Sequence, residues 1–183
     1  MKNVRKNLGG VRLIRMIGLA FIMIISVSLG TFFGKVYGFR VEDLKSFKRA
    51  MIILKSEIEY MGTPLYQALN NIGDKLKGSP VSNIFYDFGE QLQEHVSPDI
   101  ALQNSLNKYK EKIYILPDDK SNIISFGKTV GYLDKELQIN NIDLILSYLN
   151  ERIEEETKHY IKYKKLYQTL GILAGLLIVI ILV

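Results

Sequence analysis

Apolar residues recur at alternating spacings of three and four along most of the chain, which is the pattern of amphipathic helices. The first such seam consists of Leu44, Phe47, Met51, Leu54, Ile58 and Met61. Shorter seams with the same period follow between residues 65 and 113. No segment alternates between apolar and polar residues with period two over the length of a strand. The pattern therefore predicts an all-α protein.

The prolines divide this helical region. Three of them follow a hydroxyl residue, at Thr63-Pro64, Ser79-Pro80 and Ser97-Pro98, and the fourth, Pro117, precedes two aspartates. A side-chain oxygen caps the free N–H groups of a helix start, and proline suits the first helical turn. The four prolines therefore predict four helix starts.

The last part of the chain contains one long seam. Neither glycine nor proline occurs between Asp134 and Lys165, and within the seam only Glu156 stands at an apolar position. We expect one helix that begins near Asp134 and continues into the apolar end of the chain. Together the seams predict an antiparallel bundle of about six helices.

The two ends of the chain differ from the bundle in composition. Residues 16–34 and 166–183 carry no charged side chain. At about 1.5 Å per residue each is long enough to cross a bilayer core of roughly 30 Å. No small-residue cleavage site follows the first segment, so an anchor is expected rather than a signal peptide. We predict two transmembrane helices flanking a soluble helical domain at 35–165, after a basic tail at 1–15.

Both apolar segments contain small residues at helical spacing. The small residues are Ser26, Gly30 and Gly34 in the first segment, in a row that continues to Gly38 after it, and Gly171 and Gly175 in the second. Such rows let helix backbones approach closely in lipid. They predict packing between the two segments or with partner helices.

The positions of the basic residues suggest on which side of the membrane the soluble domain lies. The chain has 183 residues, a net charge of +5 and a pI near 9.2. Basic residues lie on both sides of the first apolar segment, but only before the second. By the positive-inside rule the domain is expected in the cytoplasm. The positions expected to face anionic membrane lipid are Lys35, Arg40, Lys158, Lys162, Lys164 and Lys165.

One stretch imitates a phosphate-binding loop. Ile123–Gln138 reads "IISFGKTVGYLDKELQ" and contains GKT, but Asn122 stands where a P-loop requires glycine, and no strand pattern precedes it. A structural interpretation fits better. Gly127 would allow close approach of a neighbouring helix, Gly131 would end a short helix, and Asp134 would cap the final one.

No catalytic, cofactor or metal site is predicted. His95 and His159 lack metal-ligand spacing, and the absence of cysteine removes thiolate chemistry. Glu57 and Glu59 point to different faces of a helix, so they do not form an acid–base pair; Glu57 fits a structural or solvated role, or a pair with a basic neighbour. The basic excess near the apolar segments suits headgroups, and no nucleic-acid partner is expected.

Three stretches carry a family resemblance. They are "LKSEIEYMGTPLYQAL" (Leu54–Leu69), the GKT stretch, and "YKKLYQTLGILAGLLIVIILV" (Tyr163–Val183). In this order, and with an apolar segment at each end, they resemble the stage III sporulation protein AB family, a small relative of the cytoplasmic domains of type II secretion platform (F-type) proteins. The residues that match are Glu57, Ile58, Thr63, Pro64, Leu65, Phe126, Gly127, Gly131, Asp134 and Gln138. Where the secretion relatives usually have an acidic residue, this chain has Lys128.

The resemblance implies a function. It implies a non-enzymatic protein of the mother-cell membrane. The protein would be a docking component of the secretion-like channel between mother cell and forespore. The implied partners are other stage III sporulation channel proteins, including the cytoplasmic ATPase, stage III sporulation protein AA. The alternative is a platform protein of a type II secretion or pilus assembly system unrelated to sporulation.

The matching segments also suggest where partners dock. If the first helix rises directly from the membrane, both segments share one membrane-distal surface. The candidate docking residues are Glu59, Thr63, Pro64, Lys128, Gly131, Asp134, Lys135 and Gln138.

Overall fold

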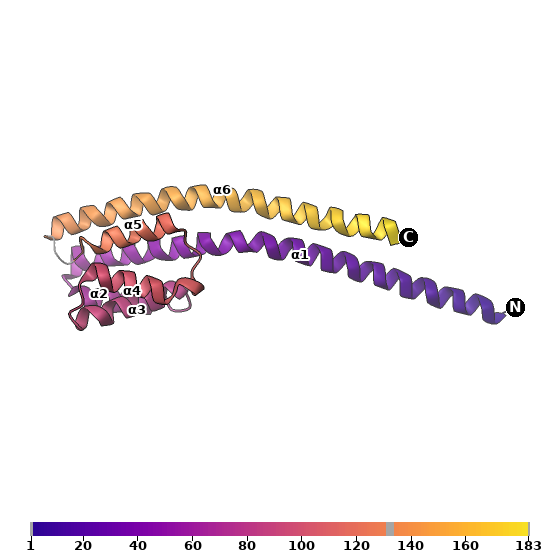
Figure 1. Ribbon diagram of the computed structural model, residues 1–183, viewed down its shortest axis with the longest axis horizontal. Helices are drawn as coiled ribbons and strands as arrows, with labels where there is room; N and C mark the ends of the chain where they lie inside the picture. Colours follow the sequence, from indigo (N-terminus) through magenta and orange to yellow (C-terminus); the bar gives the residue numbers. More distant parts are fainter. Residues whose placement is uncertain (1, 131–133, 183) are drawn as a thin grey trace. The chain divides into compact units, whose positions relative to one another are not determined.

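The structure is a computed structural model that describes the backbone of residues 2–130 and 134–182, and side chains from Met16 onward except that of Val36. Within these ranges the chain forms six α-helices and two short irregular helices, and no strand (Figure 1). The predicted all-α class is confirmed.

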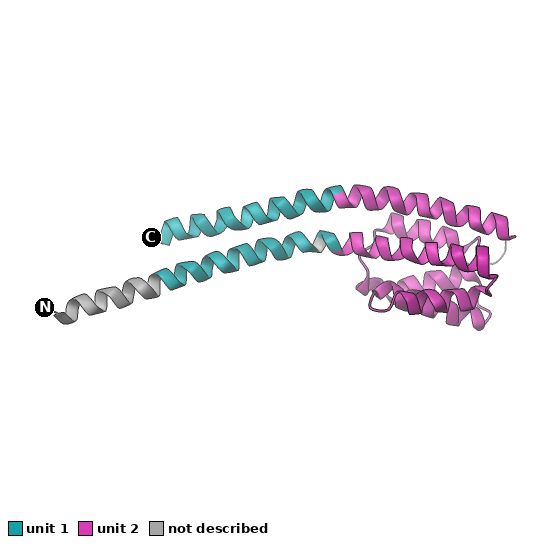
Figure 2. Cartoon of the chain, turned by 180° about the vertical axis from the view of Figure 1, so that it is seen from behind, with its two compact units in different colours: residues 1–38, 158–183 teal, residues 39–157 magenta. Residues whose placement is uncertain are grey.

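The chain divides into two compact units, which are described separately (Figure 2). Unit 1 comprises Met1–Gly38 and Lys158–Val183, and unit 2 comprises Phe39–Thr157. Helices α1 (Lys2–Ser56) and α6 (Lys135–Leu182) each contribute to both units. The single long final helix is therefore confirmed. The predicted domain limits of 35–165 follow from where charged residues stop, whereas the limits of the two units follow from packing. The units therefore do not test where the membrane segments begin and end, and those limits stay a prediction.

The four short helices of unit 2 begin where the prolines predicted. They are α2 (Leu65–Lys75), α3 (Pro80–Gln93), α4 (Pro98–Lys108) and α5 (Pro117–Gly127), and consecutive ones pack together. Only one of the predicted capping hydroxyls caps its helix. Ser79 Oγ accepts from Val81 N at 3.3 Å, whereas the Ser97 side chain makes no capping bond. The hydroxyl of Thr63 bonds elsewhere, as described below.

The core of unit 2 contains most of the predicted seams, but Met61, the last residue of the first seam, is 69% exposed. The fully buried side chains of the core include Leu44, Phe47, Met51 and Leu54 of α1, Phe85 and Phe88 of α3, and Ile142 and Leu149 of α6. The rings of Phe47 and Phe85 lie 6.3 Å apart. Gly127 has the predicted role, because a Cβ there would lie 2.9 Å from Leu102 Cδ2 of α4. Burial of these apolar faces is what holds the short helices on α1 and α6.

The first seam does not stay α-helical to its end. After Ser56 the chain forms a π-helix, η1 (Glu57–Met61), which closes on Gly62 with φ of 59°. That positive φ suits glycine, because a side chain would be strained there. A π-helix widens one turn and so rotates the side chains that follow, and such turns occur often at functional sites.

Unit 1 consists of α1 and α6 packed through the predicted small residues. A Cβ on Gly30 would lie 2.5 Å from Tyr167 O, and one on Gly171 would lie 2.8 Å from Ser26 O. Ser26 Oγ also donates to Gly171 O at 2.6 Å. Side chains larger than glycine would separate the two backbones, so the small rows are confirmed as a packing surface between the helices.

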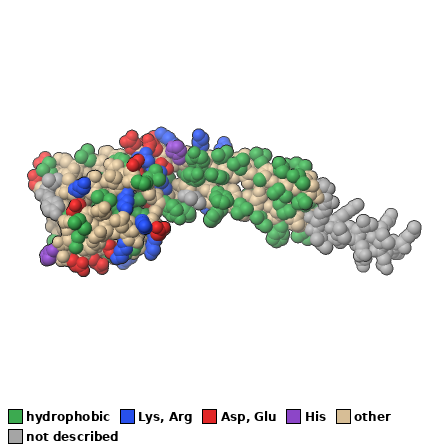
Figure 3. All heavy atoms as spheres, viewed as in Figure 1, with side chains coloured by type: hydrophobic (Ala, Val, Ile, Leu, Met, Phe, Trp, Pro, Cys, Tyr) green, Lys and Arg blue, Asp and Glu red, His purple; other side chains and the backbone are tan. Residues whose placement is uncertain are grey.

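Unit 1 leaves its large apolar side chains uncovered. Phe21 is 63% exposed and Ile181 is 73% exposed. On the face seen in Figure 3, hydrophobic side chains dominate unit 1, and charged ones gather over unit 2. Both α1 and α6 contain a stretch long and apolar enough to cross a membrane. Because so much apolar surface is unfavourable in water, unit 1 points to membrane association.

Candidate functional site

The two family-matching segments of unit 2 meet at one place. Lys135 Nζ, at the start of α6, donates to the backbone oxygen of Glu59 in η1 at 2.5 Å. A hollow of about 340 Å³ lies beside this contact, lined by Ile58, Gly62, Thr63, Leu65, Lys135 and Gln138. We call the hollow together with the half-buried Glu59 and the exposed residues Tyr60, Met61, Pro64 and Leu137 the η1–α6 surface. Segments about 76 positions apart in sequence thus form one surface.

Apolar side chains are uncovered on the η1–α6 surface. Tyr60 is 79% exposed, Met61 is 69% exposed, and Leu137 is about half exposed. Tyrosine and methionine are enriched in protein interfaces, because they offer a large contact area together with a polar or adaptable group. The arrangement suits contact with another protein.

A buried carboxylate holds η1 in place. Glu57 is buried, and its carboxylate accepts from Thr63 Oγ1 at 2.9 Å and from Lys75 Nζ at 3.1 Å. Burial favours a raised pKa, but the bonds from Thr63, Lys75 and Asn71 outweigh it, so the pKa of Glu57 lies below its ordinary value. The charged carboxylate therefore links η1 to the Thr63-Pro64 corner and to the end of α2. Glu57 therefore has a structural role and pairs with a basic neighbour, Lys75, and it is not solvated.

The remaining candidate docking residues lie around the α5–α6 connection. Asp134 Oδ1 accepts from Leu137 N at 2.9 Å, which confirms the predicted cap of the final helix. Helix α5 ends at Gly127, earlier than the sequence suggested, and Lys128 follows it as an exposed residue that does not line the 340 Å³ hollow. Gly131 lies outside the described residues.

A buried ion network, which the sequence did not reveal, joins α1, α5 and α6 in unit 2. The Asp119 side chain is 0% exposed. Its Oδ2 accepts from Arg40 Nη2 at 2.8 Å, and its Oδ1 accepts from Tyr148 OH at 2.8 Å. Arg40 Nη1 reaches Glu156 at 2.8 Å, and Arg152 also contacts both carboxylates.

This network corrects the expectation for Arg40. Instead of facing headgroups, its guanidinium lies between two carboxylates of the bundle, because pairing there compensates the loss of water. It also explains why Glu156 interrupts the apolar seam of the last helix. The pKa of Asp119 is held below its ordinary value: burial favours raising it, but the bonds from Leu116 N–H, Tyr148 and Arg40 prevail. Burial, with the bond to Asp119, raises the pKa of Tyr148 to about 12.

The other basic positions expected near lipid lie in unit 1, among aromatic rings. Lys35, Lys158, Lys162 and Lys165 are exposed there, and Lys164 Nζ lies 5.4 Å from the centre of the Tyr160 ring. The rings of Tyr37 and Tyr163 stack at 4.7 Å. Tyrosines and lysines together are typical of the border between lipid and water.

In the described part of the chain, no group of three or more His, Asp or Glu side chains is placed to hold a metal ion. The GKT residues Gly127, Lys128 and Thr129 lie at the end of α5 and in the turn after it, and the described residues contain no strand. What unit 2 offers is a helical surface with uncovered apolar side chains.

Comparisons with known proteins agree on one family. The model of a family described as stage III sporulation protein AB matches residues 15–183. The curated stage III sporulation protein AB of Bacillus subtilis (strain 168) is 29% identical over 171 residues, which cover 93% of this chain and 99% of that protein. A solved structure of a stage III sporulation protein AB is similar with a TM-score of 0.62 and 27% identity, over 67% of this chain and 97% of that one. The chain belongs to the stage III sporulation protein AB family, and this membership places it among sporulation proteins.

Proposed function

We propose that this protein is a membrane-anchored docking component of the secretion-like channel between mother cell and forespore, needed for endospore formation. One observation carries the proposal. The contact between Lys135 and Glu59 joins the two family-matching segments into the η1–α6 surface, beside uncovered apolar side chains. Tyr60 is 79% exposed and Met61 is 69% exposed, and a partner protein bound here would cover both side chains.

The surface is built to stay in one shape. The ion pair and hydrogen bond of Glu57 hold the π-helix, and the Asp134 cap holds the start of α6. A preformed surface loses little conformational entropy on binding, so more of the contact energy is available for affinity. This rigidity supports docking better than it supports a moving gate.

Anchoring follows from unit 1. Its two helices are long and apolar enough to span a bilayer, and their small residues pack them as a pair. Because Lys158, Lys162, Lys164 and Lys165 lie just before the second apolar segment, unit 2 is proposed to face the mother-cell cytoplasm. The membrane is the mother-cell membrane around the forespore.

The proposed partners are other stage III sporulation channel proteins, including the cytoplasmic ATPase named protein AA. The protein itself is proposed to be non-enzymatic and to require no cofactor. Its family membership favours this function over a secretion or pilus platform unrelated to sporulation.

A test replaces the uncovered side chains in the native spore-forming host. Tyr60→Ala and Met61→Ala together should reduce the sporulation frequency and the amount of channel proteins that co-purify. Protein level and membrane localisation should stay unchanged, because exposed side chains contribute little to folding. The matched control is Leu144→Ala, which removes a side chain of α6 that is 69% exposed outside this surface. Normal sporulation of the double variant would refute the proposal.

A further inference from the structure

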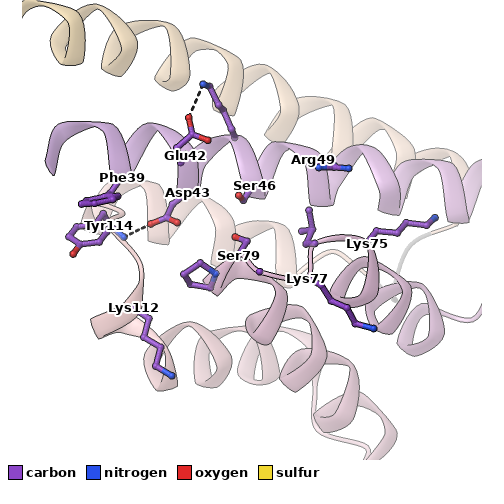
Figure 4. A pocket seen from close by; sticks show the side chains of 14 residues that line it. Phe39, Glu42, Asp43, Ser46, Arg49, Lys75, Lys77, Ser79, Lys112 and Tyr114 are labelled. Atoms are coloured by element: carbon purple, nitrogen blue, oxygen red, sulfur yellow. Dashed lines mark hydrogen bonds and ion pairs between the residues drawn. The ribbon is translucent and has the colours of Figure 1, made fainter. Parts of the chain in front are cut away.

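A second hollow of unit 2 lies away from the η1–α6 surface. It encloses about 490 Å³ between α1, the α2–α3 connection and the segment at 112–114 (Figure 4). None of its lining residues belongs to the η1–α6 surface as defined above. Lys75 is shared in effect, because its Nζ pairs with Glu57 beneath η1, but changes at Arg49, Lys112 or Tyr114 leave the residues of the η1–α6 surface in place.

Basic side chains dominate the lining of this hollow. The lysines and arginine are Lys45, Arg49, Lys75, Lys77 and Lys112, and the carboxylates are only those of Glu42 and Asp43. They come from α1, the end of α2, the connection to α3 and the segment before Tyr114, so the fold gathers them from separate parts of the chain (Figure 4). A cavity lined by one sign of charge attracts ligands of the opposite sign.

Two of these cations have no carboxylate partner among the residues that the structure describes. Lys45 pairs with Glu42 at 3.1 Å, and Lys75 and Lys77 also have acidic neighbours. In the described part of the chain Arg49 forms no ion pair, and Lys112 Nζ lies only against the Tyr109 ring, at 5.7 Å. Asp43 is buried, and its Oδ2 accepts from Tyr114 N at 2.7 Å. Its carboxylate is therefore turned to the backbone rather than to either of these cations.

The other wall of the hollow is apolar. The rings of Phe39 and Tyr114 stack with their centres 5.4 Å apart, and both side chains are about half exposed. Leu76 and Pro80 also line the hollow. An occupant that only carried negative charge would leave these rings unused.

The length of the hollow distinguishes a peptide from a small ion. Along α1 the lining runs from Phe39 to Arg49, which is about 15 Å at the helical rise of roughly 1.5 Å per residue. An extended peptide advances about 3.3 Å per residue, so four or five residues would fill this length. A single phosphate would reach only one end.

We propose that this hollow binds an extended acidic segment of a partner protein. Its carboxylates pair with Arg49 and Lys112, and an apolar side chain of the segment packs against Phe39 and Tyr114. The free cations supply attraction and the aromatic wall supplies contact area, which together give specificity beyond charge alone.

The test uses the full chain in uncharged detergent micelles. The probe is a fluorescent pool of eight-residue peptides with Asp or Glu at alternate positions and randomised apolar residues between them, followed by anisotropy. We expect saturable binding that weakens as salt is added, because salt screens charges near the surface. A matched pool with Asn and Gln should bind at least about tenfold more weakly.

Variants locate the binding. Arg49→Glu and Lys112→Glu should each weaken binding of the peptide pool by about tenfold. Lys128→Glu makes the same change of charge on an exposed residue outside the hollow and should leave peptide binding unchanged. Tyr114→Ala should weaken binding of the peptides but should not change any binding of inorganic phosphate. The proposal is overturned if the peptide pool does not bind, or if Lys128→Glu weakens peptide binding as much as Arg49→Glu does. It is also overturned if inorganic phosphate alone, or anionic vesicles alone, displaces the peptides from the site that contains Arg49. Any of these results leaves the η1–α6 docking proposal standing, because that surface has other residues.

Discussion

Asp119→Asn is the most informative change to unit 2. It keeps the shape of the side chain and removes the charge at the centre of the buried network. Arg40 and Arg152 would then face a neutral amide in a place where Asp119 has no exposure. Because α1, α5 and α6 meet at this carboxylate, the change should weaken the whole bundle rather than one helix.

The magnitude follows from what remains paired. Removing one partner of a buried ion pair costs about 3–5 kcal/mol. Here Glu156 still pairs with Arg40 at 2.8 Å, and the amide oxygen of asparagine can still accept one of the former bonds. We therefore expect the free energy of unfolding of unit 2 to fall by about 2–4 kcal/mol near neutral pH.

Asp43→Asn is the matched control. Asp43 is also a buried aspartate, but burial raises its pKa and its bond is to a backbone N–H, which an amide oxygen can accept equally well. The change should alter the free energy of unfolding by less than about 1 kcal/mol. Two chemically identical substitutions thus have different expected results, because only Asp119 faces arginine.

The pH dependence separates the two residues further. The pKa of Asp119 is lower in the folded state, so its contribution is present above its ordinary pKa of about 3.9 and is lost as pH falls through the folded value. Asp43 has the opposite sign, because its raised pKa makes stability fall as pH rises from the ordinary value through the folded one. In Asp119→Asn the free energy of unfolding should therefore decrease less steeply as the pH falls into the acid range.

The assay is native-state hydrogen exchange by mass spectrometry on the full chain in detergent, which measures the opening free energy of each helix. In Asp119→Asn the amides of α3 and α5 should lose protection together. The reasoning is refuted if Asp119→Asn stays within about 0.5 kcal/mol of the native chain, or if Asp43→Asn is equally damaging.

Three further predictions test other parts of the structure. Glu57→Gln removes the buried charge beneath η1, so hydrogen exchange of residues 57–65 should speed up by an amount equivalent to about 1–3 kcal/mol, and unchanged exchange there would contradict the assigned role. Gly171→Val adds atoms where a Cβ would already lie 2.8 Å from Ser26 O, so spin labels on the two helices of unit 1 should move apart; an unchanged distance would argue against this packing. Lys135→Glu and Glu59→Lys reverse charges of the η1–α6 surface and should each block sporulation at normal protein level, whereas a defect confined to juxtamembrane lysine variants would locate the function elsewhere.

The sequence predicted what depends on neighbouring residues. The prolines marked the helix starts because their fixed φ and missing N–H act within one turn. The Asp134 cap and the unbroken α6 likewise follow from residues close in sequence. The small residues of the apolar segments revealed the packing of unit 1, because close approach of backbones tolerates few other side chains.

Pairs across long sequence separations were not predictable in this way. Arg40 was assigned to lipid by its position near an apolar segment, although its partners lie 79 and 116 positions further along the chain. Glu156, standing alone in an apolar seam, was the available sign of a buried pair. Periodicity could not reveal η1 either, because a seam in the sequence does not show that one turn has widened.

The most direct test of the docking function is photo-crosslinking from the η1–α6 surface in sporulating cells. A photoreactive amino acid replaces Tyr60, the most exposed aromatic residue of this surface, and Leu144 serves as the control position. The account predicts crosslinks from position 60 to a stage III sporulation channel protein, such as the cytoplasmic ATPase, and none of these from position 144. Crosslinks from position 60 only to lipid, or the same products from both positions, would contradict it.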